Sequence, residues 1–368
     1  MWRRLKLYLK NFDWFILAAL LLLVAFGLVE IYSVALGQES FSLLNFKKQV
    51  FFAGVGFLLF FFFSLADVYF FKSLSRPLYV FSLLILVAVL LFGSTIRGTK
   101  GWFNIMGLGI QPVELVKIVV VLFLADFFAK LATRVKTSQH FLKSAAGVLL
   151  LVALVLWQPD FGSALILGAI WLIMSLAAGF NKKYFIIVGL IVVIVFTASW
   201  FFFFKDYQKE RLATFFNPAA DSLESGYNIS QAMIAIGSGG LTGKGVGFGS
   251  QSQLKFLPEA QNDFIFAVIA EELGFLGVSL IFFFYFILFF RCLVALKRIN
   301  NDFGIYFIIG AAGLIFIQMF INIGMNIGVM PVVGLSLPFI SYGGSSLLSL
   351  LILMGLVENI IIKSKISY

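Results

Sequence analysis

Long apolar runs recur along the whole 368-residue chain and constrain its fold more than any other feature. Each run has about 17–25 residues, the length that a helix needs to cross a hydrocarbon core of ~30 Å. Charged residues make up only 12% of the chain, roughly half the share in a soluble domain. The sequence therefore predicts an all-α, polytopic integral membrane protein that forms one membrane domain, residues 1–368.

The apolar runs predict ten transmembrane helices, and a large loop, 205–262, separates the seventh from the eighth. The first run is too long for a signal-peptide core and is not followed by a convincing small-residue cleavage site. The ten ranges are 14–36, 49–66, 77–95, 112–132, 141–157, 162–180, 184–204, 264–290, 304–323 and 341–362.

Lys and Arg residues concentrate in alternate loops, and this bias predicts the orientation of the chain. One side holds both termini and most of the 27 basic residues, whereas the short loops of the other side hold only Lys47, Lys48, Arg97 and Lys100. Both termini are therefore expected in the cytoplasm, with the large loop outside. The net charge of +10 then arises mainly from a basic belt against anionic membrane lipids. It does not indicate nucleic-acid binding.

An ionisable pair opens the fourth predicted helix. Glu114 and Lys117 follow Pro112 and lie three residues apart, so they share one helix face and can pair. An unpaired ion at that depth costs at least about 2.5–3.5 kcal/mol. The pair either orients helices or presents Lys117 as a cation to an anionic headgroup, with Glu114 holding it in place.

Two further outward segments contain polar residues whose roles stay open. Asp160 lies in the turn 158–163 and either caps the next helix, a position that Asp favours, or forms part of a site wall. The glycine-rich segment 237–249 contains Lys244 but lacks the Gly at 238 and the Ser or Thr at 245 of a phosphate-binding loop. We expect instead a flexible glycine hinge that lets main chain approach a bulky ligand.

Carboxylates mark the passage from the large loop into the eighth helix. Segment 257–272 (LPEAQNDFIFAVIAEE) carries Glu259 and Asp263 at the membrane boundary, where ionisable groups tend to be kept for function. Glu271 lies eight residues, or about 12 Å of helix, beyond Asp263, and we expect it to stabilise helix packing through a polar partner. Segment 322–346, broken by Pro and Gly, predicts a cavity wall, because broken helix at membrane depth needs protein or cavity water around its backbone.

Four segments resemble the SEDS family (shape, elongation, division, sporulation), in the family's order and over essentially the whole chain. Segment 249–259 (GSQSQLKFLPE) is also more similar to the RodA branch than to the FtsW branch. The four segments are 111–117 (QPVELVK), 158–163 (QPDFGS), 257–274 (LPEAQNDFIFAVIAEELG) and 338–346 (PFISYGGSS).

The chain departs from the family pattern at three places. Val113 stands where Ser is usual, and Gln261 and Asn262 replace a His-Thr pair. Gly109 stands where many members carry Arg, so a cation expected there could come from Arg97 or Lys100.

The resemblance implies a function in cell-wall synthesis. It implies a ten-span fold and polymerisation of lipid II into glycan strands at the outer face of the bacterial cytoplasmic membrane, for cell elongation and shape. It also implies an essential acid at Asp263. The implied partners are lipid II, the growing undecaprenyl-linked glycan and a class B penicillin-binding protein.

An α-linked donor that gives a β-linked glycan requires inversion, and therefore a general base for the attacking hydroxyl. Asp263 is the predicted base. The leaving pyrophosphate needs charge stabilisation, from Lys117, Arg211 or Lys255, or from a divalent cation (Mg²⁺ or Mn²⁺) held by carboxylates. The predicted substrate-binding residues are Glu114, Lys117, Asp160, Arg211, Lys255 and Glu259.

Other functions fit part of the pattern. Glu259 could act as an acid beside Asp263, as in glycosidases, although a pyrophosphate leaving group makes an acid unnecessary. A lipid II flippase would also have intramembrane charges and broken helices, but the two halves of the chain show no corresponding pair of interrupted segments. A division-specific, FtsW-like polymerase and a scaffold for a catalytic partner are the remaining alternatives.

Overall fold

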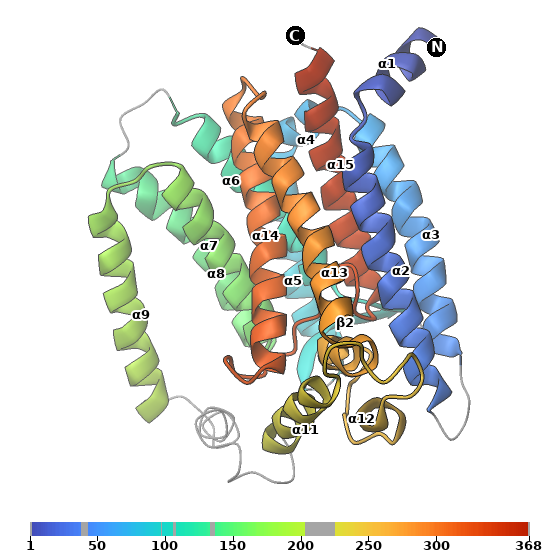
Figure 1. Ribbon diagram of the computed structural model, residues 1–368. Coiled ribbons are helices and arrows are strands. Elements are labelled where there is room, and N and C mark those ends of the chain that lie inside the picture. The colour runs from blue at the N-terminus through green and yellow to red at the C-terminus, as the bar shows by residue number, and fades with distance from the viewer. Residues whose placement is uncertain are drawn as a thin grey trace.

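The computed structural model describes residues 2–37, 43–96, 98–105, 108–132, 137–202 and 225–366, and it is a mostly helical bundle with both termini at one end (Figure 1). The helices are α1 (Trp2–Asn11), α2 (Trp14–Leu36), α3 (Leu44–Leu65), α4 (Val68–Ser73), α5 (Ser75–Phe92), α6 (Pro112–Ala129), α7 (Ser138–Trp157), α8 (Phe161–Ala177), α9 (Lys182–Phe202), α11 (Ser225–Ser238), α12 (Ser250–Gln253), α13 (Ile265–Leu296), α14 (Asp302–Asn326) and α15 (Gly344–Ile366).

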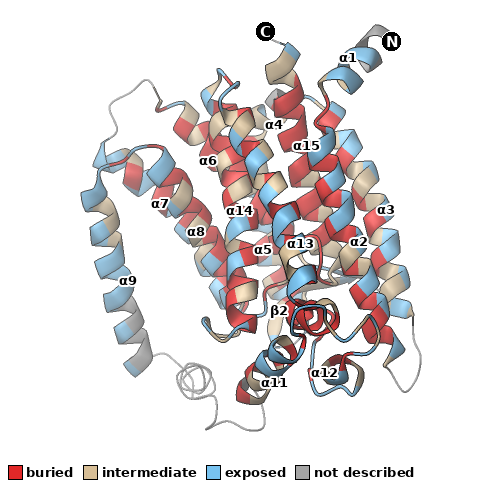
Figure 2. Ribbon diagram, viewed as in Figure 1, coloured by how far each residue is buried: buried red, intermediate tan, exposed pale blue. Residues whose placement is uncertain are grey.

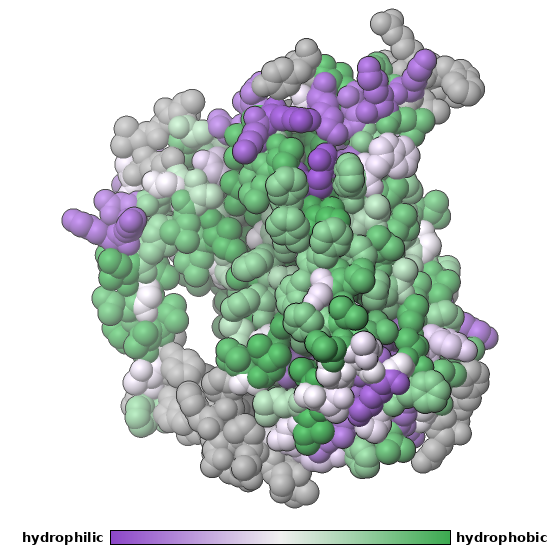
Figure 3. Space-filling view, in the orientation of Figure 1, coloured by the Kyte–Doolittle hydropathy of each residue, from purple (hydrophilic) through white to green (hydrophobic). Residues whose placement is uncertain are grey.

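Each predicted apolar range overlaps one long helix. Within the described residues, seven helices are long and apolar enough to cross a membrane, namely α2, α3, α5, α7, α13, α14 and α15. Helix α8 is apolar but shorter, and α6 carries the charged residues Glu114, Lys117 and Asp126. Hydrophobic side chains cover the middle of the molecule, while hydrophilic ones gather at the end that carries the termini (Figure 3). The chain is therefore a multi-pass membrane protein, as its composition predicts.

Local sequence sets where several helices begin. The side chain of Asp13 accepts a hydrogen bond from the Ile16 amide at the start of α2, and the Asn301 side chain accepts one from Gly304 at the start of α14. Pro112 occupies the first turn of α6, where its missing N–H leaves no hydrogen bond unmade. These residues satisfy or avoid main-chain donors that a helix start leaves without a partner.

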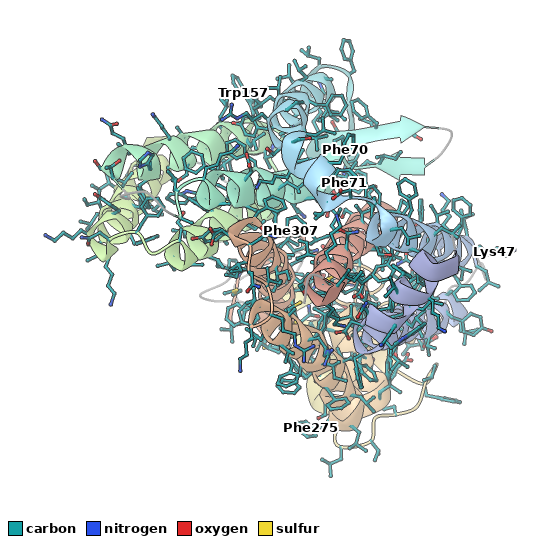
Figure 4. The ribbon with its side chains drawn as sticks, turned by 90° about the horizontal axis from the view of Figure 1, so that it is seen from above. Lys47, Phe70, Phe71, Trp157, Phe275 and Phe307 are labelled. Atoms are coloured by element: carbon teal, nitrogen blue, oxygen red, sulfur yellow. The ribbon has the colours of Figure 1, made fainter. Side chains whose placement is uncertain are left out.

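The core forms where α15 packs on α3, α14 packs on α6 and α8, and α13 packs on α2. Buried residues follow the central helices, and exposed ones the periphery (Figure 2). A Cβ atom added at Gly355 would lie 2.6 Å from the Phe60 carbonyl oxygen, so glycine there permits close approach of α15 and α3. Seen from above, α7, α8 and α9 form one side of the bundle (Figure 4), and the described side chains of α9 are mostly exposed.

Several elements were not predicted. Residues 94–110 contain a small antiparallel sheet, β1 (Ser94–Ile96), β2 (Thr99–Ile105) and β3 (Leu108–Ile110), in the order β1-β2-β3. The all-α class thus needs this one addition. The large loop is not structureless, since it includes α11 and α12. Residues 205–224 of that loop lie outside the described residues.

Helix α13 is interrupted at Gly274, whose φ of 64° and ψ of −161° are not helical. Figure 1 shows the short piece before the break turned away from the axis of the long piece. Asp263 and Glu271 both precede the break, so the eight-residue separation between them runs along the short piece and not along the axis of the long piece. Phe275, just after the break, points outward (Figure 4). The glycine-rich segment pairs with the interruption through main-chain hydrogen bonds of 2.9–3.1 Å, from Lys244 to Glu271, Gly245 to Glu272, Phe275 to Gly240 and Leu276 to Leu241.

Residues 239–253 are called here the glycine loop. Two of its glycines are needed for that pairing. A Cβ atom would lie 1.8 Å from the Ala270 carbonyl oxygen if added at Gly239, and 2.1 Å from that of Glu272 if added at Gly243. The glycines therefore let the main chain of the loop approach the main chain of α13, and not a ligand as predicted. We therefore replace the hinge prediction with a docked loop.

Candidate functional site

Asp263 lies immediately before α13 and is half-buried. Its main-chain carbonyl accepts hydrogen bonds from the side-chain amides of Asn322 (3.0 Å) and Asn326 (2.9 Å) on α14. Its carboxylate faces Gly334, where an added Cβ would lie 3.7 Å from Oδ2. The predicted catalytic acid is thus fixed through its main chain, while its carboxylate meets the Gly/Pro-rich segment between α14 and α15.

That segment packs against the residues around Asp263. The Ser341 hydroxyl donates to the Asn262 carbonyl (2.6 Å), and the Tyr342 amide donates to the Gln261 carbonyl (2.8 Å). The predicted wall 322–346 is helical at both ends and irregular only between α14 and α15. This segment therefore packs beside the acid, and its irregular part has narrower limits than the predicted wall.

Glu114 and Lys117 form the expected pair on α6. Lys117 Nζ lies 2.7 Å from Glu114 Oε1, and the residues are 7% and 1% exposed. The other oxygen, Glu114 Oε2, has no hydrogen-bond partner among the described residues. Removing either partner of a pair this deeply buried would leave the other group without its counter-charge, which is strongly destabilising.

Asp160 caps α8, which resolves one of its two open roles. Its Oδ1 accepts a hydrogen bond from the Ser163 amide (2.9 Å) and its Oδ2 accepts one from the Gln111 side chain (3.0 Å). The main-chain N–H of Gln111 donates to the Ser345 hydroxyl at the start of α15 (3.1 Å). The starts of α6, α8 and α15 therefore meet at one place.

A close contact joins this place to the acid. A Cβ added at Gly162 would lie 2.7 Å from the Val333 carbonyl oxygen, so the start of α8 touches the stretch that includes Gly334 and faces Asp263. The start of α8, which Asp160 caps, and the Asp263 carboxylate therefore lie against two adjacent residues, 333 and 334.

The two loop residues lie nearer the surface. Lys255 and Glu259 are exposed, and both have left-handed main-chain conformations, with φ of 60° and 54°. Glu259 Oε2 accepts a hydrogen bond from the Asn262 side chain (2.6 Å), next to Asp263. Arg211 and Arg97 lie outside the described residues.

Glu271 has the structural role that its position in the sequence predicts. It is fully buried and pairs with Lys244 at 2.8 Å. It also accepts hydrogen bonds from Ser250, Gln251 and Ser252 of the glycine loop. Glu271 therefore holds the loop on α13.

Sequence reasoning missed the residues that fix Asp263. Asn322 and Asn326 lie one turn apart in a largely apolar helix. That spacing is the signal in the sequence, because buried amides need partners. Glu30 on α2 was also missed; it is fully buried, and neither of its oxygens has a hydrogen-bond partner among the described residues.

The fold and this site define a polytopic helical membrane protein with an acid held at the start of a broken helix. The family model described as cell cycle protein, which joins FtsW, RodA and SpoVE, matches residues 13–366. The chain therefore belongs to this family, which confirms the SEDS resemblance.

Relatives and a solved structure agree with this assignment. Stage V sporulation protein E of Bacillus subtilis (strain 168) is 34% identical over 92% of this chain and 94% of its own length. Peptidoglycan glycosyltransferase MrdB of Escherichia coli (strain K12) is 38% identical over 77% of this chain and 76% of its own. A chain from a structure described as showing structural coordination of polymerization and crosslinking by a peptidoglycan synthase complex is 31% identical, with a TM-score of 0.81 over 96% of this chain and 98% of that chain.

Proposed function

We propose that this chain is a peptidoglycan glycosyltransferase that polymerises lipid II into glycan strands during cell-wall elongation. The observation that carries the proposal is the environment of Asp263. The residue is half-buried, and two side-chain amides donate hydrogen bonds to its main-chain carbonyl. The similarity to MrdB, which is named for this activity, supports it. A division role like that of FtsW is the alternative within the same activity.

In the proposed reaction, Asp263 is the general base. Its carboxylate removes the proton from the acceptor hydroxyl as the oxygen attacks the anomeric carbon of the donor. The bond from that carbon to the pyrophosphate breaks on the opposite face, so the configuration inverts and undecaprenyl pyrophosphate leaves. A general base must lie ~2.6–3.2 Å from the hydroxyl, which a half-exposed carboxylate at a membrane boundary allows.

The basic residues stabilise the leaving group in this proposal. Lys117, held by Glu114 at 2.7 Å, supplies a fixed cation in low dielectric, where such a charge is worth more than in water. Lys255 on the large loop approaches the pyrophosphate from outside; Arg211, proposed for the same role, lies outside the described residues. Glu259 and Asp160 shape the walls on either side of Asp263.

A divalent cation, Mg²⁺ or Mn²⁺, enters the proposal only as a counter-ion of the pyrophosphate. Among the described residues, no group of three or more His, Cys, Asp or Glu side chains could hold a metal. Mg²⁺ is often bound by one or two carboxylates together with substrate phosphates. Asp263 and Glu259 are the carboxylates that fit this arrangement.

We also propose the cellular setting. The ten long helices cross the bacterial cytoplasmic membrane as a single domain, with both termini in the cytoplasm and the Asp263 end outside, because basic residues concentrate at the termini. A class B penicillin-binding protein crosslinks the product; the similarity to a chain of a peptidoglycan synthase complex supports this partner. Membrane lipids contact the basic belt.

The decisive experiment measures glycan polymerisation on lipid II by the full chain with its penicillin-binding partner, with and without EDTA. We expect polymer from the wild type and none from folded Asp263→Asn. Loss of polymer with EDTA would support the cation. Glu259→Gln tests the second carboxylate: near-normal activity leaves Asp263 as the single essential carboxylate, and loss of activity shows that Glu259 takes part, as acid or as cation ligand. If the wild type makes no polymer but moves lipid II across vesicles, the chain is a flippase.

A further inference from the structure

Three amide side chains form a ladder along the last turns of α14. Gln318, Asn322 and Asn326 follow one another at four-residue spacing, so they lie on one helix face. Gln318 is 1% exposed and the two asparagines are 0% exposed. Buried amides need hydrogen-bond partners. The nitrogen of each of the three donates to main chain of another segment, whereas Gln318 Oε1 and Asn322 Oδ1 have no partner among the described residues.

The two asparagine side chains of this ladder both contact the main chain of Asp263, the proposed catalytic acid. Nδ2 of Asn322 and Nδ2 of Asn326 both donate to the main-chain carbonyl of Asp263, at 3.0 and 2.9 Å. Oδ1 of Asn326 also accepts a hydrogen bond from the Ala267 amide at 3.2 Å. Asn326 thus ties the residue before α13 to the first turn of that helix.

Asn322 also holds the wall that the acid faces. Its Nδ2 donates to the Leu335 carbonyl at 2.6 Å, one residue from Gly334, whose added Cβ would lie 3.7 Å from Asp263 Oδ2. One amide group therefore contacts both the main chain of the acid and the wall opposite its carboxylate. The distance between these two parts depends on Asn322.

Asparagine suits this position better than other residues of its size. Carbonyl oxygens surround Nδ2 of Asn322, so the group there must be a donor, and a carboxylate of the same shape would face them with acceptors only. An aliphatic side chain would leave the Asp263 and Leu335 carbonyls without these donors.

We propose that Asn322 and Asn326 are positioning residues for Asp263 in the transfer reaction. They act through the main chain of the acid and not on the substrate, so they should affect the chemical step more than lipid II binding. A misplacement of 1 Å in an active site can reduce the rate about 100-fold. The inference rests on the proposed function.

The test compares alanine variants of the ladder in the full chain with its penicillin-binding partner. Asn322→Ala and Asn326→Ala should lower kcat about 10- to 100-fold while KM for lipid II changes less than about threefold. Asn359→Ala on α15 is the matched control, because this buried amide donates to the Ser64 and Ala66 carbonyls at the end of α3 and not to the segments around Asp263. It removes a buried amide of the same kind and should retain kcat within about threefold.

Each outcome separates the two claims. If the wild type makes polymer, Asp263→Asn does not, and both asparagine variants keep the kcat of the control, the positioning role is refuted while the proposed function stands. If the wild type makes no polymer, both claims fall. Should an alanine variant not fold, Asn322→Ser and Asn326→Ser keep a donor in a smaller side chain that reaches less far. A lowered kcat with little change in KM then supports the inference, and an unchanged kcat refutes it.

Discussion

Removal of the Glu271 carboxylate should release the glycine loop from α13. The carboxylate is fully buried and receives the Lys244 ammonium at 2.8 Å, with further donors in Ser250, Gln251 and Ser252. Breaking a buried ion pair by removing one partner costs about 3–5 kcal/mol. Lys244 is partly exposed and can turn to water, so we take the lower end, about 3 kcal/mol, for Glu271→Ala.

That value predicts a measurable opening. About 1.4 kcal/mol corresponds to a factor of ten, so 3 kcal/mol raises the population of the undocked loop about 100-fold. Amide hydrogen exchange in the detergent-solubilised protein should be faster by that factor at 244–252, where the loop is held, and little changed in α14 and α15. The exposed Lys255→Ala serves as control.

The result that would refute this reasoning is unchanged exchange at 244–252 in folded Glu271→Ala. The main-chain pairing with the break in α13 would then be sufficient to hold the loop, and the carboxylate would contribute little. Uniformly faster exchange throughout the bundle would instead show that Glu271 stabilises the whole fold.

Three further predictions concern other buried groups. Glu30→Gln should raise the melting temperature, because a neutral amide can donate to Glu272, the neighbouring carboxylate on α13, without the charge repulsion between the two carboxylates; an unchanged or lower value in a thermal-shift assay would contradict this. Gly243→Ala should lower the melting temperature, because its Cβ would lie 2.1 Å from a carbonyl oxygen at φ 78°, whereas Gly237→Ala, with open space around its Cβ, should not; equal effects would exclude the docking argument. Glu114→Ala should destabilise the protein by about 3–5 kcal/mol, because Lys117 would keep a buried charge without its partner; a normal denaturation midpoint would show that this cation is neutral or hydrated.

The sequence predicts those parts of the fold that depend on neighbours along the chain. Apolar run lengths gave the helices, the spacing of Glu114 and Lys117 gave their ion pair, and Asp160 was recognised as a cap candidate from its position before a helix. Each of these features depends on residues a few positions apart, and helix geometry alone determines which of those residues are in contact.

The remainder depends on contacts between distant segments. The Asn322 amide meets Asp263 across 59 residues, and the Asp13 amide donates to Glu358 across 345 residues. No periodicity encodes such pairings. The glycine loop shows the same limit, because its composition indicated close approach of main chain, but only the fold identifies α13 as the partner.

The break in α13 has a consequence for how the protein is made. A continuous apolar helix can enter a bilayer with all its main-chain hydrogen bonds internal, whereas α13 needs residues 240–245 to complete the bonds around Gly274. Those residues precede α13 in the chain, so the ribosome releases them first. In the proposed orientation the large loop crosses the membrane, so we expect its translocation to be coupled to insertion of the next helix, because a loop left on the other side could not complete the hydrogen bonds around Gly274.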